Sequence, residues 1–221
     1  VFKLLDEGTA FKRNVRDGDR VAKGFVFLEF EGDASILLKG ERTALNILQH
    51  MSGIATKTAE FCSRVQDLPV EIIDTRKTMP GLRQLEKYAV RAGGGSNHRF
   101  CLSDGVLIKD NHIKAAGSIT QAVEQARAGI QHTVKIEVEA ETLEQVVEAL
   151  EAGADIIMFD NMSPEMMKQA VKLVGGRALT EASGDVNLDR VRDVALTGVD
   201  MISVGELTHT VKAANISMRF V

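Results

Sequence analysis

From Pro69 onward, hydrophobic and polar residues repeat one pattern: a short β-branched run ends in polar residues and is followed by an amphipathic stretch with helical spacing. Such alternation predicts parallel strands joined by helices. The predicted strands are 70–73, 106–108, 134–138, 156–159, 178–180 and 201–204, and the predicted helices are 81–91, 118–128, 142–152, 164–173, 187–197 and 207–214. Six such units are more than a small doubly wound sheet needs, so the pattern favours an α/β barrel, with an open sheet as the alternative.

The chain before residue 67 follows a different pattern. Residues 12–39 alternate and turn in short steps, which predicts antiparallel β-structure with Glu31-Gly32-Asp33 as its hairpin connection. Residues 41–66 place apolar side chains near helical spacing and predict one long or broken helix. Ser52-Gly53 interrupts this stretch and indicates a kink or a close packing contact.

The composition argues against two classes of protein. No run approaches the roughly 18 consecutive apolar residues of a membrane span. The formal net charge is -4, whereas a sequence-independent nucleic-acid binder needs an excess of Lys and Arg. Cys62 and Cys101 show neither metal-ligand spacing nor a disulfide framework. We therefore expect a soluble cytoplasmic protein that binds neither nucleic acid nor a membrane.

Every predicted strand ends in polar or small residues, and parallel barrels bind their ligands at the carboxyl ends of the strands. Cations follow the first two strands, carboxylates the next two, and small residues the last two, where backbone N–H groups could approach a phosphate. This division predicts a site with three kinds of ligand chemistry. The residues at the strand ends are Asp74, Arg76, Lys77, Lys109, Asp110, Asn111, His112, Glu137, Glu139, Asp160, Asn161, Glu181, Ser183, Gly184 and Gly205.

The cations lie in a segment with a local positive charge. Between Glu71 and Lys114 there are eight Lys or Arg and five Asp or Glu, inside a chain of net charge -4. Arg presents a planar fork that matches a carboxylate and Lys presents a mobile point charge, so the mixture suits a ligand with carboxylate and phosphate groups. Arg83, Lys87 and Arg91 fit instead the solvent-exposed face of the predicted helix 81–91.

Two strand-end acids are candidates for Mg²⁺ or for ribose hydroxyls, because hard carboxylate oxygens suit this ion. They are Glu139 and Asp160. The alternative is a strand-end acid paired with Lys109 or Lys77. Glu137 shares a strand face with Glu139, and parity alone does not choose between them.

Five separated blocks occur in a fixed order: DTRKTMPGLR (74–83), GGGSNHR (93–99), LSDGVLIKDNH (102–112), KIEVE (135–139) and ISVGELT (202–208). Together they resemble the quinolinate phosphoribosyltransferase family, from Glu41 to the C-terminus. The resemblance implies a pentosyltransferase of NAD biosynthesis, which joins quinolinate to phosphoribosyl pyrophosphate with Mg²⁺ and gives nicotinate mononucleotide, pyrophosphate and CO₂. It also implies an incomplete, seven-stranded α/β barrel with a small N-terminal α/β sandwich domain, assembled as a homodimer or higher homo-oligomer.

The same resemblance implies a role for each site residue. The residues expected around the two carboxylates of quinolinate are Arg76, His98, Arg99 and Lys109, with Lys77 towards the ribose and pyrophosphate. Arg42 is similar to an arginine that crosses into the neighbouring subunit's site. Glu139 and Asp160 match carboxylates near the ribose hydroxyls and the metal, which favours Glu139 over Glu137. The positions that match phosphate-binding residues are Ser183, Gly184, Gly205 and His209, and the expected catalytic residues are Lys77, Lys109, Glu139 and Asp160.

The expected domains follow from this likeness. They are part of the sandwich domain over 1–40, a linking helix over 41–66, the barrel over 67–205, and a C-terminal segment over 206–221 that returns towards the N-terminal domain. The family's opening segment is expected to be missing ahead of Val1. Asp185 follows Ser183-Gly184 at a position where the family usually has glycine or asparagine. An acid there should repel a phosphate unless its side chain points away or pairs with a cation.

Two other functions stay open. One is nicotinate phosphoribosyltransferase, whose substrate has a single carboxylate, and the doubled set of cations on the first two strands argues against it. The other is a non-catalytic, anion-binding accessory barrel. A protein that only binds has no physical need for the complete set of Arg42, Lys109, Glu139 and Asp160.

Overall fold

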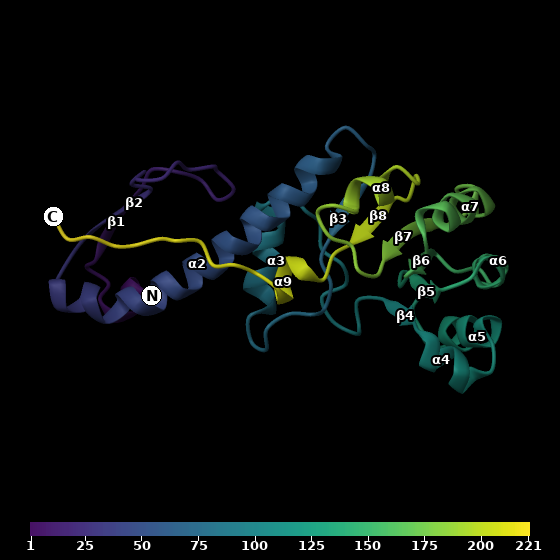
Figure 1. The fold of residues 1–221 in the computed structure, drawn as a ribbon. Helices are drawn as coiled ribbons and strands as arrows, with labels where there is room; N and C mark the ends of the chain where they lie inside the picture. The colour runs from purple at the N-terminus through teal and green to yellow at the C-terminus, as the bar shows by residue number, and fades with distance from the viewer.

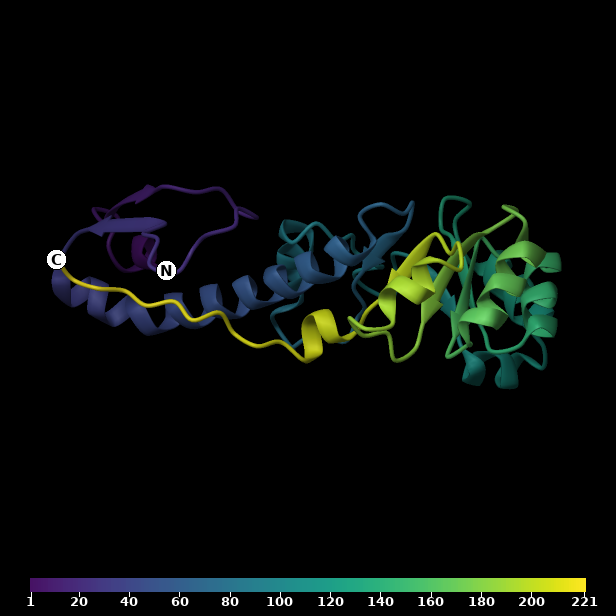
Figure 2. The same cartoon turned by 45° about the horizontal axis from the view of Figure 1, so that its top comes forward.

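The computed structural model describes residues 1–221 and shows an elongated molecule. A small N-terminal unit and a larger α/β unit lie at opposite ends of one long helix, α2 (Ala34–Val65) (Figure 1). Figure 2 shows the same arrangement after a rotation, with helices on the outside of the sheet. No helix, α2 included, has the length and apolar character needed to cross a membrane.

Six parallel strands form the sheet of the larger unit. They are β3 (Glu71–Ile73), β4 (Val106–Ile108), β5 (Ile136–Ala140), β6 (Ile156–Asp160), β7 (Leu179–Ser183) and β8 (Met201–Ser203), in the order β3-β8-β7-β6-β5-β4. Each strand from β4 to β8 pairs with the next in sequence, and β8 pairs with β3. This is the order of a barrel that is open between β3 and β4.

The expected seventh strand is reduced to a single parallel bridge at the β3 edge of the six-stranded sheet. Ser96 pairs in parallel with Ile73, where its N–H donates to the Ile72 carbonyl at 2.8 Å and its carbonyl accepts from the Asp74 N–H at 3.2 Å. The ladder stops there because the next residues, Asn97 and His98, donate to the side chain of Asp74 instead of a strand.

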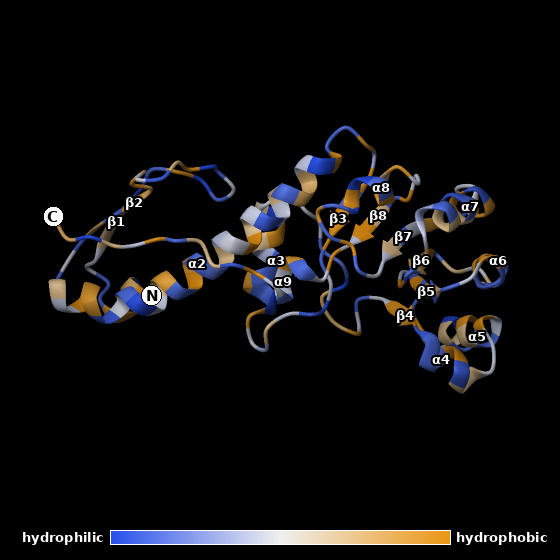
Figure 3. Ribbon diagram, in the orientation of Figure 1, coloured by the Kyte–Doolittle hydropathy of each residue, from blue (hydrophilic) through white to orange (hydrophobic).

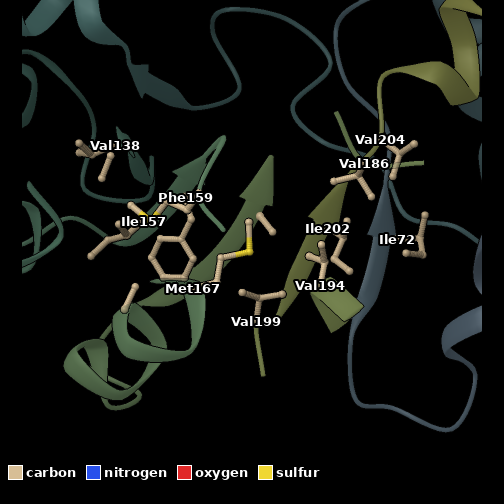
Figure 4. Close-up of a cluster of buried hydrophobic side chains, with 14 of the residues drawn as sticks. Ile72, Val138, Ile157, Phe159, Met167, Val186, Val194, Val199, Ile202 and Val204 are labelled. Carbon is tan, nitrogen blue, oxygen red and sulfur yellow. The ribbon is translucent and has the colours of Figure 1, made fainter. Parts of the chain in front are cut away.

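Helices cover the outer face of the sheet, where they and the strands form the hydrophobic core. The core includes Val138, Ile157 and Phe159 of the strands and Met167 of a covering helix (Figure 4). Three of the helices begin at side-chain caps, Ser118, Thr142 and Ser163. The helices are α3 (Arg83–Ala92), α4 (Asp110–Ala116), α5 (Ile119–Gly129), α6 (Leu143–Glu151), α7 (Pro164–Val174), α8 (Val191–Ala195) and α9 (Glu206–His209). The last two are shorter than the pattern predicts.

The inner face of the barrel is polar. Side chains alternate along β5, so Val138 faces the helices while Glu137 and Glu139 face the opposite side. Glu139 lies opposite Met158, which lies opposite Glu181, and these three therefore share that side. The barrel interior thus collects carboxylates.

The N-terminal unit contains α1 (Phe2–Leu5) and an antiparallel pair, β1 (Ala10–Arg13) and β2 (Leu28–Glu31). Residues 14–27 connect the two strands, so the prediction of a hairpin at 31–33 was wrong. That segment leads instead into α2, because the Asp33 side chain accepts the N–H of Ser35 at 2.8 Å and caps the helix. The long helix therefore begins at Ala34 and not at Glu41.

Helix α2 continues without a break through Ser52-Gly53. A side chain at Gly53 would overlap the carbonyl oxygen of Lys212, so the glycine marks a close packing contact. Residues 210–221 run back along α2 to the N-terminal unit, and the Gln49 carbonyl accepts the Ala214 N–H at 2.9 Å (Figure 1). Hydrophilic and hydrophobic residues alternate along α2, whereas β4 and β8 are largely hydrophobic (Figure 3).

Candidate active site

The parallel sheet brings the predicted strand-end residues to one rim of the barrel. Arg76 and Lys77 follow β3 and Lys109 follows β4, while Glu139 and Asp160 lie near the ends of β5 and β6. Arg42 is the exception. It is exposed on α2, two residues after Gly40, which packs against Phe2 of the N-terminal unit, and it follows no strand of the barrel.

Arg76 and Arg99, here called the arginine pair, carry the strongest mark of an anion site. Each has a buried Nε without a hydrogen-bond partner. Nη1 of Arg99 donates to the Gly105 carbonyl at 2.7 Å. Burial lowers the pKa of the Arg99 guanidinium, and the neighbouring charge of Arg76 lowers it further. Two like charges held close with unused donors are suited to a carboxylate ligand.

His98 lies beside the arginine pair with both ring nitrogens engaged by the protein. Its Nδ1 is 2.7 Å from the Arg99 N–H and accepts it, so the ring proton is on Nε2. Nε2 is 3.1 Å from Glu137 Oε2 and 3.7 Å from Glu181 Oε2. In this arrangement the ring holds the backbone of Arg99, and a direct contact between His98 and quinolinate stays a prediction.

Glu137 and Glu181 form a buried acid pair, although the resemblance assigned neither residue a role. Each has one buried carboxylate oxygen without a partner, and burial raises the pKa of Glu181 well above its ordinary value, with Glu137 adding to the shift. With His98 they offer three metal-ligand atoms within 4.8 Å of one another. Because Nδ1 of His98 accepts a hydrogen bond, its Nε2 carries a proton and cannot ligate a metal in this tautomer.

Glu139 lies nearer the rim than Glu137 and forms an ion pair with Lys109. Burial raises the pKa of Glu139, Lys109 opposes this shift, and the charges of Asp160 and Glu137 add to it. The alternative of a strand-end acid paired with Lys109 is therefore present in the structure. It is compatible with metal binding, since two neighbouring carboxylates with hard oxygens fit Mg²⁺ that completes its shell with substrate phosphates.

The small residues of the rim form two close approaches. Gly205 is so near Lys77 and His209 that a Cβ there would lie 3.3 Å from Cδ of Lys77 and 3.0 Å from Nε2 of His209. Ser183-Gly184 lies beside Asn161, whose N–H donates to the Ser183 carbonyl at 3.0 Å. Both glycines thus allow the backbone to pass close to neighbouring groups, and phosphate binding at these turns stays a prediction.

Asp185 has a left-handed backbone with φ 47° and an exposed side chain. Its carbonyl accepts Nη1 of Arg190 at 3.1 Å. This hydrogen bond holds the turn through the backbone of Asp185, and the Asp185 carboxylate takes no part in it.

Replacing Gly184 by alanine should destabilise the fold and weaken phosphate binding together. Gly184 has φ +98°, and a Cβ would overlap Oδ1 of Asn161, so the turn has to move. We expect a loss of about 1–3 kcal/mol in the free energy of unfolding and a raised KM for phosphoribosyl pyrophosphate. Thermal unfolding and steady-state kinetics measure the two effects. Gly129→Ala is the matched control, because nothing lies within 4 Å of its Cβ position, and equal behaviour of both variants would refute the close approach.

Helix α3 departs from the prediction of a solvent-exposed basic face. Arg91 is exposed, but Arg83 is half-buried and Lys87 is only 2% exposed. Lys87 forms an ion pair with the fully buried Asp74. The spacing along α3 could not predict this ion pair, because Asp74 lies outside the helix, after β3.

Two family models match the chain. They are described as Quinolinate phosphoribosyl transferase, N-terminal domain, over residues 1–52, and Quinolinate phosphoribosyl transferase, C-terminal domain, over residues 54–219. The chain is 53% identical over 217 residues to a probable nicotinate-nucleotide pyrophosphorylase (carboxylating) of Bacillus subtilis, which covers 98% of this chain and 75% of that protein.

Similar agreement comes from a plant relative and a solved structure. Quinolinate phosphoribosyltransferase (decarboxylating) 2, mitochondrial, of Nicotiana glauca is 42% identical over 237 residues, which covers 99% of this chain and 67% of that protein. The crystal structure of NadC from Streptococcus pyogenes matches with a TM-score of 0.96 at 46% identity, covering 99% of this chain and 78% of that one. Both domain models match in order along a chain with this fold, and the protein therefore belongs to the quinolinate phosphoribosyltransferase family.

Proposed function

We propose that this protein transfers phosphoribose from phosphoribosyl pyrophosphate to quinolinate with loss of CO₂, giving nicotinate mononucleotide and pyrophosphate for NAD biosynthesis in the cytoplasm. The observation that carries the proposal is the arginine pair, with two buried and unpartnered Nε atoms, on the same rim as Glu139 and Asp160. The arginine pair suits the two carboxylates of quinolinate. Glu139 and Asp160 suit a ribose that gains positive charge as pyrophosphate departs.

The arginine pair would fix the two carboxylates of quinolinate through charge-assisted hydrogen bonds. A ligand held at two points cannot rotate, so the pyridine nitrogen is kept in line with the anomeric carbon of the second substrate. Lys109 would lie between the arginine pair and the two rim acids, and it already forms an ion pair with Glu139.

Substitution at the anomeric carbon develops negative charge on the departing pyrophosphate and positive charge on the ribose. The bond to pyrophosphate oxygen breaks with its electron pair, and the pyridine nitrogen supplies the pair for the new bond. Lys77 and His209, beside Gly205, would stabilise the departing pyrophosphate, and the backbone of Ser183-Gly184 would bind phosphate oxygens. Glu139 and Asp160 would stabilise positive charge on the ribose. These two acids would also hold Mg²⁺, which supplies neutralising charge to the pyrophosphate when bound.

Loss of CO₂ follows from the new charge on the ring. Once the nitrogen is quaternary, it accepts the electrons of the bond between the ring carbon and its carboxylate. CO₂ leaves, and the ring carbon takes a proton from water. The protein's part in this step is to keep that carboxylate beside Arg76 and Arg99 until the nitrogen has reacted.

A test of the whole reaction uses quinolinate labelled in the carboxylate adjacent to the ring nitrogen. Incubation with phosphoribosyl pyrophosphate and Mg²⁺ should release labelled CO₂ and pyrophosphate in equal amounts. Binding of quinolinate without CO₂ release under these conditions would instead assign the protein to non-catalytic anion binding.

The exposed position of Arg42 supports a shared active site in a homodimer. Arg42 lies near the contact between α2 and the N-terminal unit and not after a barrel strand, as expected of an arginine that enters a partner's site. We expect Arg42→Ala and Lys109→Ala each to be inactive alone. After the two variants are mixed and allowed to exchange subunits, about a quarter of the wild-type activity should return, because half of the dimers then contain one intact site out of two. Activity that stays absent after proven exchange would place Arg42 outside the partner's site.

A further inference from the structure

Helix α3 presents three charged side chains to the loops that carry the arginine pair. Arg83, Glu86 and Lys87 are three and four residues apart and so share one face of the helix. Glu86 is fully buried, accepts the Met79 N–H at 3.1 Å through Oε2, and lies 2.8 Å from Nε2 of His50 on α2 through Oε1. The loop after β3 is thereby tied to both helices.

Arg83 spans the two loops with one guanidinium. Its Nε donates to Oγ1 of Thr78 at 2.8 Å and its Nη2 to the carbonyl of Arg76 at 3.3 Å, both in the loop after β3. Its Nη1 donates to the carbonyl of Phe100 at 3.2 Å, in the loop next to Arg99. A planar fork therefore fixes the distance between the backbones that carry the arginine pair.

Lys87 makes a second bridge below the first. Its ammonium pairs with Asp74 at the end of β3 and donates to the His98 carbonyl at 2.9 Å. Asp74 in turn accepts the His98 N–H at 2.9 Å and the side-chain amide of Asn97 at 2.6 Å. Burial raises the pKa of Asp74 while Lys87 opposes the shift, as expected for an enclosed ion pair.

These bridges lie where the barrel has no strand ladder. Past Ser96 the segment has no further strand partner, and the sheet is open up to β4. The two guanidinium groups of the arginine pair also repel each other, and for this reason the charge of Arg76 lowers the pKa of Arg99. Something other than the sheet has to hold the two guanidinium groups at a fixed separation.

We propose that Arg83 and Lys87 are positioning residues that set the separation of the arginine pair and thereby select a ligand with two adjacent carboxylates over one with a single carboxylate. The nitrogens of both side chains are hydrogen-bonded to the protein, so both would act on the ligand through the arginine pair. The inference rests on the proposed function, because the selected ligand is the dicarboxylate substrate of that site.

The main test variant is Arg83→Met, which keeps an unbranched apolar side chain and removes the fork. Arg91→Met, on the same helix but exposed, is the matched control. Titration calorimetry measures binding of phthalate, a non-reacting 1,2-dicarboxylate, and of benzoate as the monocarboxylate. Kinetics give kcat and the KM of each substrate, and thermal unfolding reports the fold.

We expect Arg83→Met to weaken phthalate binding and raise the KM for quinolinate by about tenfold or more, the effect of losing one or two hydrogen bonds from a charged group. Benzoate binding and the KM for phosphoribosyl pyrophosphate should change by less than about twofold on the same scale. Arg83→Lys restores the charge but not the fork, and should resemble Arg83→Met.

Lys87→Met leaves Asp74 buried without its cation and could fail to fold, so it is tested as Lys87→Met with Asp74→Asn. This double variant should show the same loss of selectivity for phthalate over benzoate. The inference is overturned if Arg83→Met binds phthalate as Arg91→Met does, if Arg83→Lys binds like the wild type, or if binding of all ligands falls equally. Wild-type protein that binds phthalate but forms no CO₂ would contradict the proposed reaction and leave the selectivity result intact.

Discussion

Replacing Arg99 by glutamine should raise the KM for quinolinate by about 30-fold or more, because truncating one partner of a desolvated charge pair costs about 2–5 kcal/mol. The backbone N–H of Arg99, which His98 accepts, is unchanged by the substitution. The hydrogen bond from Nη1 to the Gly105 carbonyl is lost, but the larger effect is the missing cation opposite the ligand. The KM for phosphoribosyl pyrophosphate should stay nearly constant, because the residues proposed to bind phosphate, Ser183-Gly184 and Gly205, lie at β7 and β8.

Steady-state kinetics with each substrate varied in turn measure both constants. Arg91→Gln is the control, since Arg91 is exposed on α3 and takes part in none of the loop contacts described. If Arg99→Gln kept the wild-type affinity for quinolinate, the arginine pair would not be the carboxylate site. A fall in kcat at unchanged KM would move Arg99 from substrate binding to a role in the reaction step.

Replacing Glu139 by glutamine should lower kcat by about 100-fold and change the KM for quinolinate little. The substitution keeps the shape but removes the negative charge that would stabilise the ribose as pyrophosphate departs, and losing one such electrostatic contact costs about 10²–10³-fold in rate. It also releases Lys109 from its ion pair, which leaves an additional cation near the rim.

Glu141→Gln is the matched control, because Glu141 is an exposed acid just beyond the same strand. The measurement is kcat under saturating substrates, with thermal unfolding to separate stability from rate. Should Glu139→Gln lower the unfolding temperature while keeping kcat, the Lys109–Glu139 pair would be structural only.

The barrel and its rim could be predicted from sequence because both follow from local rules. Alternation of β-branched runs with amphipathic stretches predicts parallel strands, and parallel strands bring their carboxyl ends to one edge. Five of the expected rim residues, Arg76, Lys77, Lys109, Glu139 and Asp160, lie there for that reason. No knowledge of long-range contacts is needed for this step.

The start of α2 and the strand number depended on single contacts that the pattern does not reveal. Ile36 and Leu38 fit a strand as well as a helix, and the capping side chain of Asp33 decides between them. The seventh strand ends after Ser96 because Asn97 and His98 bond to the side chain of Asp74. Polar residues that end a ladder look the same in sequence as those of any loop.

Burial of charge was the part least visible in the sequence. Lys87 has the spacing of a surface residue, and its burial follows from Asp74 on a different element. Glu137 and Glu139 have the same parity, and only the depth of each along the barrel interior separates the acid beside His98 from the acid at the rim. The Glu-x-Glu repeat on one strand was the signal that two inward acids were present.

The most direct test compares pyrophosphate release from phosphoribosyl pyrophosphate with quinolinate and with nicotinate as acceptor, at equal concentrations and with Mg²⁺. Two guanidinium groups, each with a buried and unpartnered Nε, predict release with quinolinate and none above background with nicotinate, whose single carboxylate leaves one of them unpaired. Equal or faster release with nicotinate would contradict the assignment of Arg76 and Arg99 to two carboxylates.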